Sequence, residues 1–497
     1  MRHPSLLQVN TRIALEERGR SLGRPATLDD LPDAALDAFA AARVEWLYLL
    51  GVWQTGLASR QVSRASRSIR DALTKALPDL CEEDVTGSPF AVRAYTVRDE
   101  WGGDEALARL RGRLAERGIR LMLDYVVNHV ALDHPWLDQH PEFFVHGTRD
   151  LLEREPQNWI ERRAGGRPAV LAHGRDPYFA GWADTLQLDY RHPDLRVAMG
   201  FELAQVAARC DGVRCDMAML VQPDVFSNTW RDAPPPMGGV TAESGPFWPA
   251  AIARVREVNQ AFTFMAEVYW DREWELQQEG FDFTYDKRLY DRLREGSGSS
   301  VRAHLLAGSD YQTRSTRFLE NHDEARAAEV FALDVHRAAA VVAFLVPGMR
   351  FFHEGQREGR RVHVSMHVGR RPQETPDPQV VAFYDRLLPL LGRPEVHDGE
   401  WTLWQCRSAW EGNGTSDDMI VFTWTRGERR LLVAVNYAPR QGQCYVTLDL
   451  PGLEGRTFTL VDLLGDARYE RTGDGLRTNG LYLDMAAWGH HVFELTE

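Results

Sequence analysis

"DEALARLRGRLAERGIRLMLDYVVNH" spans residues 104–129 and joins a helix pattern to a buried strand pattern. Apolar residues at 107, 110, 114 and 115 lie on the helical stretch, and Gly118 follows it as a C-terminal cap. The run that starts at Ile119 is mostly apolar until Asp124, as is typical of a strand that is covered on both faces of a parallel sheet. The segment therefore predicts one helix–strand unit of an α/β fold.

The same alternation of β-rich runs and amphipathic helices continues over the first four-fifths of the chain. We expect strands at residues 6–12, 45–53, 119–127, 212–219, 262–269, 281–285, 316–321 and 349–355. Eight strands with helices between them fit a (β/α)8 TIM barrel with insertions. A doubly wound open sheet is the alternative, but no GxGxxG motif follows an early strand to support it.

Two stretches depart from this rhythm. Residues 130–189 are rich in His, Pro, Trp and Arg without a clear period, and they predict an inserted domain B between the third strand and the third helix. After about residue 392 the pattern changes to alternating strands with polar turns, which predicts a C-terminal antiparallel β-sandwich. We therefore expect a barrel at 1–129 and 190–392, domain B at 130–189 and the β domain at 393–497.

Composition excludes several classes of function. The 497 residues carry 58 basic and 72 acidic side chains, a net charge of −14, which argues against a nucleic-acid partner. No stretch reaches the roughly 18 apolar residues of a membrane span, and the start, MRHPSLLQVNTR, lacks the apolar core of a signal peptide. Five cysteines without CxxC spacing suit a reducing compartment, so we expect a cytoplasmic protein without a membrane partner.

Four short segments end predicted strands in polar or ionisable residues. They are Asp124-Tyr-Val-Val-Asn-His129, Gly212-Val-Arg-Cys-Asp216, Met265-Ala-Glu267 and Phe318-Leu-Glu-Asn-His-Asp323. A single carboxylate at a strand end is usually a helix cap or an ion-pair partner. Four such segments in barrel order point instead to one site, because TIM-barrel enzymes keep their active sites at the C-terminal ends of the strands. Two carboxylates that meet at a sugar can divide the work of attacking the anomeric carbon and protonating the leaving oxygen.

The four segments resemble the four signature regions of the α-amylase superfamily, glycoside hydrolase family 13, in the same order. Leu186-Gln-Leu-Asp189-Tyr190 is similar to the fifth segment of that family, near the end of its domain B. The resemblance covers the barrel, domain B and the C-terminal β domain. It implies that Asp216 is the nucleophile, that Glu267 is the general acid/base, and that Asp323 binds the sugar 2- and 3-hydroxyls and stabilises the transition state.

The resemblance also implies supporting roles for neighbouring polar residues. Arg214 would hold Asp216 ionised through a charge-assisted hydrogen bond. His129 and His322 would donate hydrogen bonds to hydroxyls of the same sugar ring, and Asp124 would orient the base of the pocket.

Aromatic residues near these segments suggest sugar contacts. Phe90 aligns with a stacking tyrosine of the exo-acting α-glucosidases, but Ala91 stands where those enzymes use an aspartate to hold the non-reducing end. Tyr269 and Trp270 follow Glu267 and either form an acceptor-side platform or pack against a neighbouring loop. In many amylases a Lys-His pair follows the nucleophile, and here residues 219–220 are Met-Leu, which weakens the likeness to a long-chain α-amylase.

Calcium and anions are two further possibilities. Asn128 matches a structural calcium ligand of many amylases, and aspartates of domain B would have to converge on it to complete a site. Local hydrogen bonding is the alternative role for Asn128. We therefore expect no required cofactor and leave structural calcium open. The loop after the eighth strand contains five arginines, at 357, 360, 361, 370 and 371. These either form a solvated surface or bind an anionic sugar.

The sequence thus favours a retaining glycosidase that acts on the α-glucosidic bonds of an α-glucan or α-glucoside. A transglycosidase, an isomerase of the trehalose-synthase type, a sucrose-acting enzyme or a phosphorylase of the same superfamily is the first alternative. A catalytically inactive binding homologue is the second, although such proteins usually lose a carboxylate and all three are present here.

Overall fold

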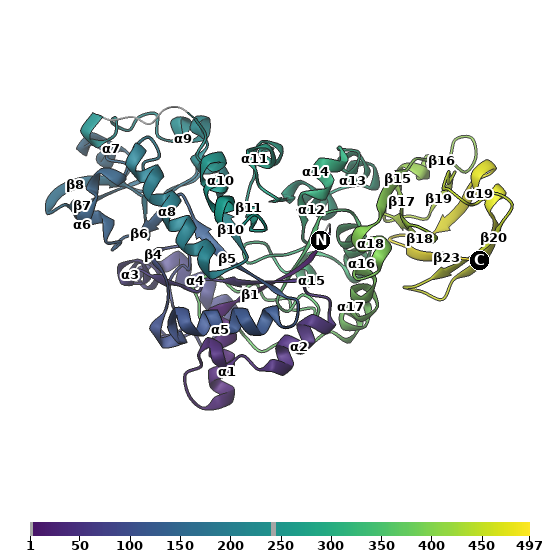
Figure 1. The fold of residues 1–497 in the computed structure, drawn as a ribbon, viewed down its shortest axis with the longest axis horizontal. Coiled ribbons are helices and arrows are strands. Elements are labelled where there is room, and N and C mark those ends of the chain that lie inside the picture. The colour runs from purple at the N-terminus through teal and green to yellow at the C-terminus, as the bar shows by residue number, and fades with distance from the viewer. Residues whose placement is uncertain (1–2, 240–244) are drawn as a thin grey trace.

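A computed structural model describes residues 3–239 and 245–497. Eight parallel strands close into a barrel in the order β1-β14-β13-β12-β11-β10-β5-β2 (Figure 1). The strands are β1 (Ser5–Asn10), β2 (Trp46–Leu50), β5 (Arg120–Val126), β10 (Gly212–Asp216), β11 (Thr263–Ala266), β12 (Phe283–Tyr285), β13 (Ser315–Arg317) and β14 (Met349–His353). Each predicted strand corresponds to one of them, so the TIM barrel is confirmed and the open-sheet alternative is wrong.

Several barrel strands end earlier than the sequence pattern predicts. β11 stops at Ala266, directly before Glu267, and β13 stops at Arg317, well before Asp323. The apolar pattern continues past the last ladder hydrogen bond because residues beyond the strand end are still buried. The polar residues of interest therefore lie on the loops at the C-terminal rim of the barrel.

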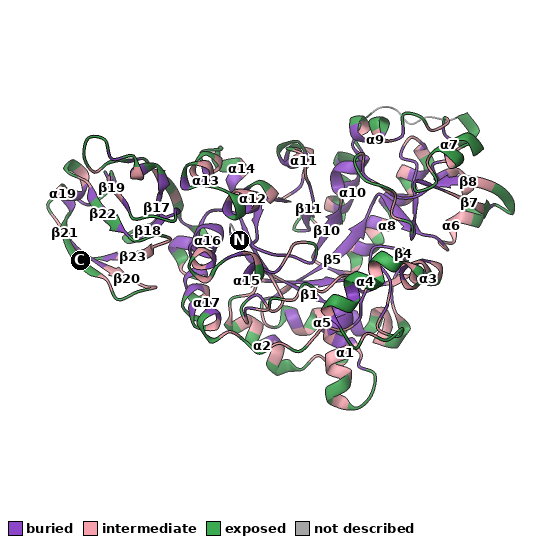
Figure 2. Ribbon diagram, turned by 180° about the vertical axis from the view of Figure 1, so that it is seen from behind, coloured by how far each residue is buried: buried purple, intermediate pink, exposed green. Residues whose placement is uncertain are grey.

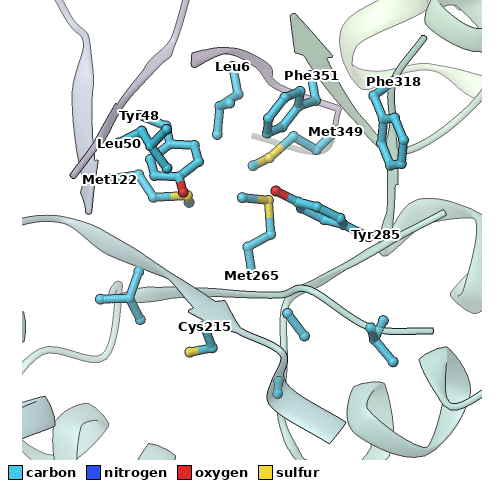
Figure 3. Packing of buried hydrophobic residues seen from close by; sticks show 14 of the residues in the cluster. Leu6, Tyr48, Leu50, Met122, Cys215, Met265, Tyr285, Phe318, Met349 and Phe351 are labelled. Atoms are coloured by element: carbon cyan, nitrogen blue, oxygen red, sulfur yellow. The ribbon is translucent and has the colours of Figure 1, made fainter. Parts of the chain in front are cut away.

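Side chains alternate between the interior of the barrel and its outer face, as strand geometry requires. Figure 3 shows Leu6, Tyr48, Met265, Tyr285 and Phe351 converging from five different strands. All five are at most 1% exposed, and the barrel strands are coloured as buried in Figure 2. The barrel interior is therefore a packed core and holds the strand ends at fixed positions.

Helices surround the barrel. They are α1 (Thr11–Leu22), α2 (Asp33–Ala41), α3 (Leu57–Ala65), α4 (Arg67–Ala76), α5 (Gly103–Ala115), α8 (Pro193–Arg209), α9 (Pro223–Thr229), α10 (Trp248–Val258), α11 (Glu273–Glu279), α12 (Lys287–Glu295), α13 (Gly298–Leu305), α14 (Ser309–Thr313), α15 (Ala327–Val330), α16 (Leu333–Leu345) and α17 (Pro378–Leu391). The helix predicted at 104–118 is α5. Gly118 follows it with φ +71°, and the N–H of Ile119 donates to the carbonyl of Leu114 at 3.0 Å, so this glycine terminates the helix as expected.

Small sheets and short helices fill the region between β5 and α8. The elements are β6 (His129–Ala131), α6 (Trp136–Gln139), α7 (Arg149–Arg154), β7 (Trp159–Ala164), β8 (Arg167–Ala172) and β9 (Thr185–Gln187), with β6 paired to β9 and β7 paired to β8. A further two-stranded sheet, β3 (Trp53–Thr55) with β4 (Val92–Val97), precedes α5. The insertion after the third barrel strand is thus present, and its boundaries at 130 and 189 stay a prediction.

Antiparallel sheets form the C-terminal part, at the opposite end of the barrel from β7 and β8 (Figure 1). After α18 (Pro394–Asp398), the six-stranded sheet contains β15 (Glu400–Trp404), β17 (Met419–Arg426), β18 (Arg429–Asn436), β20 (Thr457–Asp462), β21 (Arg468–Thr472) and β23 (His490–Thr496). The three-stranded sheet contains β16 (Cys406–Ser408), β19 (Gly442–Val446) and β22 (Leu481–Met485), and α19 (Gly473–Thr478) precedes β22. A separate apolar cluster that includes Leu432, Leu448 and Phe458 supports this part of the chain. Across the two described ranges, no helix combines the length and the apolar character that crossing a membrane requires.

Candidate active site

Arg214 lies at the centre of the carboxylate cluster. It is on β10, where Arg214 and Asp216 face the same side and Cys215 faces the other, because side chains alternate along a strand. Its Nη1 lies 2.5 Å from Asp216 Oδ1, and its Nη2 lies 2.7 Å from Glu267 Oε2. All three side chains are buried. One guanidinium therefore brings together the two carboxylates that the sequence analysis paired.

The backbone after Asp216 also holds Glu267. The amide of Glu267 donates to the carbonyl of Cys215 at 3.0 Å, which continues the pairing of β10 and β11. Met217 bends into the left-handed region with φ +43°, a conformation that costs energy for a non-glycine residue. The bend directs the N–H of Met217 to Glu267 Oε2 at 2.8 Å. The strained turn thus positions the carboxylate of Glu267.

The buried carboxylates share the positive charge of Arg214 and repel one another. Burial, together with the charges of Asp216 and Asp323, raises the pKa of Glu267 to about 7, while Arg214 opposes the rise. Burial also raises the pKa of Asp216, against the strong attraction of Arg214. Burial thus favours the protonated form of both carboxylates, and Arg214 favours the ionised form of both.

Asp124 lies beside Arg214 in the barrel. The two residues are partners in the register of β5 and β10, and Asp124 Oδ1 is 3.9 Å from Arg214 Nη1. The Tyr48 hydroxyl donates to Asp124, and the N–H of Gly51 donates to its Oδ2 at 2.8 Å. Burial raises the pKa of Asp124 to about 6. Asp124 is thus fixed by groups of the neighbouring strands, beside Arg214.

Asp323 and His322 lie on the loop after β13. His322 Nε2 lies 3.1 Å from Asp323 Oδ2, and Gln8 Nε2 lies 3.0 Å from His322 Nδ1. Burial lowers the pKa of His322 to about 3, so its imidazole is neutral. Asp323 has a side chain that is 34% exposed, more than Asp216 at 6% or Glu267 at 4%. It is thus the carboxylate most open to an incoming ligand.

The aromatic candidates fall at different places. Phe90 lies against the cluster, with its ring centroid 5.1 Å from Arg214 Cζ and 5.3 Å from the His322 ring. The Tyr269 hydroxyl donates to Glu267 Oε1 at 2.9 Å. Trp270 points elsewhere, to an edge contact with Tyr178 at 5.0 Å between ring centroids.

His129 is buried on β6, the first strand of the insertion. Its ring Nδ1 is 3.5 Å from Asn128 Nδ2, and its ring centroid is 5.0 Å from that of Trp182. Burial lowers the pKa of His129 to about 3, so its imidazole is neutral. These contacts link His129 to the insertion. The other predicted residues contact the carboxylate cluster: Asp124, Phe90, Arg214, Tyr269, His322 and Asp323.

Three supporting residues were not predicted. Gln8 and Tyr48 are polar positions within otherwise apolar strand runs, and a polar residue in a strand that is buried on both faces is the signal that could have identified them. His363 Nε2 donates to the carbonyl of His322 at 2.9 Å from the loop after β14. That loop has no periodic pattern, so no sequence signal pointed to His363.

Asn128, the residue matched to a calcium ligand, makes hydrogen bonds within the protein. Asn128 exchanges hydrogen bonds with Gln187, at 3.1 Å from its Nδ2 and 2.9 Å to its Oδ1, so its side-chain oxygen is already engaged. Asp176 accepts the N–H groups of residues 178 and 179. Within 3–239 and 245–497, no three His, Cys, Asp or Glu side chains are grouped as a metal would require.

Four of the five loop arginines are neutralised by carboxylates. Arg357 pairs with Asp385, Arg361 with Glu329, Arg370 with Asp84, and Arg371 with both Glu17 and Glu354. These ion pairs do not support the anionic-sugar interpretation of the loop. Arg360 is the exception.

Comparisons with known proteins find similarity to α-amylases. The α-amylase MalA of Haloarcula japonica is 26% identical over 254 residues, which are 50% of this chain and 32% of that protein, so the chain spans about a third of its length. A noncanonic maltogenic α-amylase, AmyB from Thermotoga neapolitana, has a TM-score of 0.69 at 17% identity, with 100% of this chain and 99% of that one covered. An α-amylase from Geobacillus thermoleovorans, solved in complex with acarbose, has a TM-score of 0.65 at 17% identity, with 99% and 98% covered.

The family match covers the part of the chain that contains the site. The description "Alpha amylase, catalytic domain" matches residues 91–377, more than half of the chain, and this range includes Asp124, Arg214, Asp216, Glu267 and Asp323. The chain therefore belongs to the α-amylase family of glycoside hydrolases, family 13.

Proposed function

We propose that the protein cleaves α-glucosidic bonds with retention of configuration, with Asp216 as nucleophile and Glu267 as general acid/base. The observation that carries the proposal is the position of Arg214, which bonds Asp216 at 2.5 Å and Glu267 at 2.7 Å. Retaining enzymes need two carboxylates about 5–5.5 Å apart, close enough for one to attack and the other to protonate. The shared bonds to Arg214 bring Asp216 and Glu267 together, which supports such a pairing.

The electrostatics are compatible with the two roles. Asp216 bonds the cation through Nη1 of Arg214, which favours the ionised form that a nucleophile requires. The pKa of Glu267, raised to about 7, keeps a proton available for the leaving oxygen near neutral pH. Asp216 attacks the anomeric carbon while Glu267 gives its proton to the departing oxygen. Glu267 then takes a proton from the water that releases the sugar from Asp216.

The remaining polar groups bind the sugar in this proposal. Asp323 and His322 are 3.1 Å apart and present an acceptor and a neutral imidazole to ring hydroxyls. Phe90 packs on Arg214 and bounds the same space. An α-glucan or α-glucoside is the proposed substrate, supported by membership of the family and by the acarbose complex of the Geobacillus relative.

Transfer of the glycosyl group to a second sugar is the other candidate, and one feature favours it. Tyr178, 68% exposed, makes a T-shaped contact with the half-buried Trp270, which lies three residues after Glu267 in the sequence. Trp270 and Asp271 both adopt the left-handed conformation, with φ +64° and +62°, and the ion pair of Asp271 with Arg288 secures the bend. Strained backbone conformations of this kind often occur where a protein holds a ligand. An exposed aromatic face can also stack on an acceptor sugar.

A product time course by proton NMR distinguishes the candidates. Maltooligosaccharides, sucrose and trehalose are each supplied with and without phosphate and with and without added glucose, and Asp216→Asn serves as the blank. We expect an α-anomeric product to appear first. New disaccharides or a sugar phosphate would favour transfer or phosphorolysis. A β-anomer as the first product would refute the retaining mechanism, and the absence of turnover with every substrate would favour an inactive homologue.

A further inference from the structure

The helical layer around the barrel has a gap over β1. Leu6 points into the barrel core (Figure 3), so its neighbours Leu7 and Val9 point outward. Strands of a parallel barrel are normally covered on both faces, yet Leu7 and Val9 are half-buried rather than buried. Helices α1 and α2 on one side and α17 on the other leave a cavity of about 470 Å³ over them.

The walls of this outer cavity are apolar. Leu49 of β2, Phe39 of α2 and Leu388 of α17 line it together with Leu7 and Val9. Pockets that bind small molecules typically measure 300–1,000 Å³ and have apolar walls with a few polar groups. At about 30 Å³ per water-sized volume, the outer cavity has room for on the order of 15 non-hydrogen atoms.

One cation at the cavity lacks a partner. Arg360 lines the cavity, and no hydrogen bond or ion pair joins its guanidinium to any residue in the described ranges, although its Nε is buried. The other arginines here are neutralised, Arg371 by Glu17 and Glu354 and Arg357 by Asp385. Arg360 is half-buried, and burying a charge that has no hydrogen-bonded partner is costly. Burial and the charge of Arg371 lower the pKa of Arg360, while Glu17, Glu354 and Glu358 oppose the shift.

We propose that the outer cavity binds an amphipathic anion, with its apolar body against Leu7, Val9 and Phe39 and its carboxylate or phosphate head on Arg360. The ligand lies outside the barrel, whereas Gln8, between Leu7 and Val9, faces inward to His322. The site is therefore separate from the carboxylate cluster, and the inference does not depend on the proposed function. Glu17, Glu354 and Glu358 also line the cavity. Glu17 and Glu354 pair with Arg371, so the charge of Glu358 is the one that opposes an anion, which supplies an internal test.

Binding is measured by titration calorimetry on the full chain. The probes are dodecanoate, dodecyl phosphate and dodecanol, all below their micelle concentrations. Arg360→Gln removes the proposed head-group contact, and Arg361→Gln is its control, since Arg361 pairs with Glu329. Ala35→Trp fills the cavity from α2, and Ala34→Trp is its control on the exposed face. Folding of each variant is checked by circular dichroism and thermal unfolding.

We expect saturable one-to-one binding of at least one of the two anions, and at least tenfold weaker binding of dodecanol. Arg360→Gln should weaken anion binding at least tenfold, Ala35→Trp should abolish it, and Glu358→Gln should strengthen it. The two control variants should bind as the wild type does, and acarbose should not compete. The relative affinities of the two anions identify the preferred head group. Absence of binding to the wild type, or equal binding by Arg360→Gln or Ala35→Trp, would overturn the proposal.

Discussion

The hydroxyl of Tyr269 donates a hydrogen bond to Glu267 Oε1 at 2.9 Å, while the other oxygen of Glu267 receives bonds from Met217 N–H and Arg214. Each of these donors stabilises the ionised carboxylate and so works against the burial that raises the pKa of Glu267 to about 7. The pKa of Glu267 thus reflects a balance between burial, which raises it, and three hydrogen-bond donors, which lower it. Removing a single donor should shift this pKa.

Tyr269→Phe should raise the pKa of Glu267 further, because the lost donor favoured the charged form. General-acid action needs the protonated form, so the alkaline limb of the kcat/KM profile should move to higher pH. The expected shift is about 0.5–1 pH unit, the effect of losing one hydrogen bond to a charged group. The measurement is a pH profile with an unactivated maltooligosaccharide. A uniform drop in rate without a shifted limb would show that Tyr269 only supports the structure.

Asp216→Asn should retain the fold and lose turnover by several orders of magnitude, because the amide is isosteric but cannot attack the anomeric carbon. Its kcat and thermal unfolding are compared with those of the wild type. Asp216→Gly with added azide supplies a sharper check, since a small external nucleophile entering the vacated space should give the β-glycosyl azide. Near-wild-type turnover of Asp216→Asn would remove Asp216 from the nucleophile role.

Glu267→Gln should lower the rate of bond cleavage selectively, depending on the leaving group of the substrate. An aryl leaving group such as 4-nitrophenolate departs with little protonation, whereas a sugar hydroxyl needs the proton of Glu267. We expect formation of the glycosyl-enzyme to slow far more with a maltooligosaccharide than with a 4-nitrophenyl maltoside, measured by rapid quench. Equal losses with both substrates would argue against Glu267 as the acid.

Hydrophobic periodicity was sufficient to predict the barrel, because the eight strands are apolar runs whose polar ends share one rim. It also indicated Asp216 and Glu267, which strand ends place side by side. The contacts that tune them were not predictable. The donation from Met217 depends on a left-handed bend at a non-glycine residue, and that of Tyr269 depends on the direction of one side chain. Asn128 has the residue type of a calcium ligand, and only the structure reveals its pairing with Gln187.

The raised pKa of Glu267 also predicts a pH-dependent cost in stability. A carboxyl whose pKa rises on folding from an ordinary 4.5 to about 7 binds its proton more tightly in the folded state. Stability is therefore lost as the pH rises from about 4.5 through 7. Glu267→Gln lacks this titration, so its free energy of unfolding relative to wild type should increase over that window, by about 1–3 kcal/mol. Urea unfolding at pH 4.5 and pH 8 measures it, and a pH-independent difference would contradict the raised pKa.

The Tyr178–Trp270 contact predicts how acceptor sugars are bound. Tyr178→Ala removes an exposed ring that meets Trp270 at 5.0 Å, whereas the adjacent Phe179, 72% exposed, supplies a matched control in Phe179→Ala. Loss of an acceptor platform should lower the ratio of transfer to hydrolysis with added glucose severalfold, because stacking on a sugar contributes about 1 kcal/mol or more. Release of glucose from the donor should change little, since the Tyr178 ring is 68% exposed and packs on Trp270. NMR product ratios measure the effect. Equal ratios for Tyr178→Ala and Phe179→Ala would assign the ring pair to packing of the insertion against the barrel.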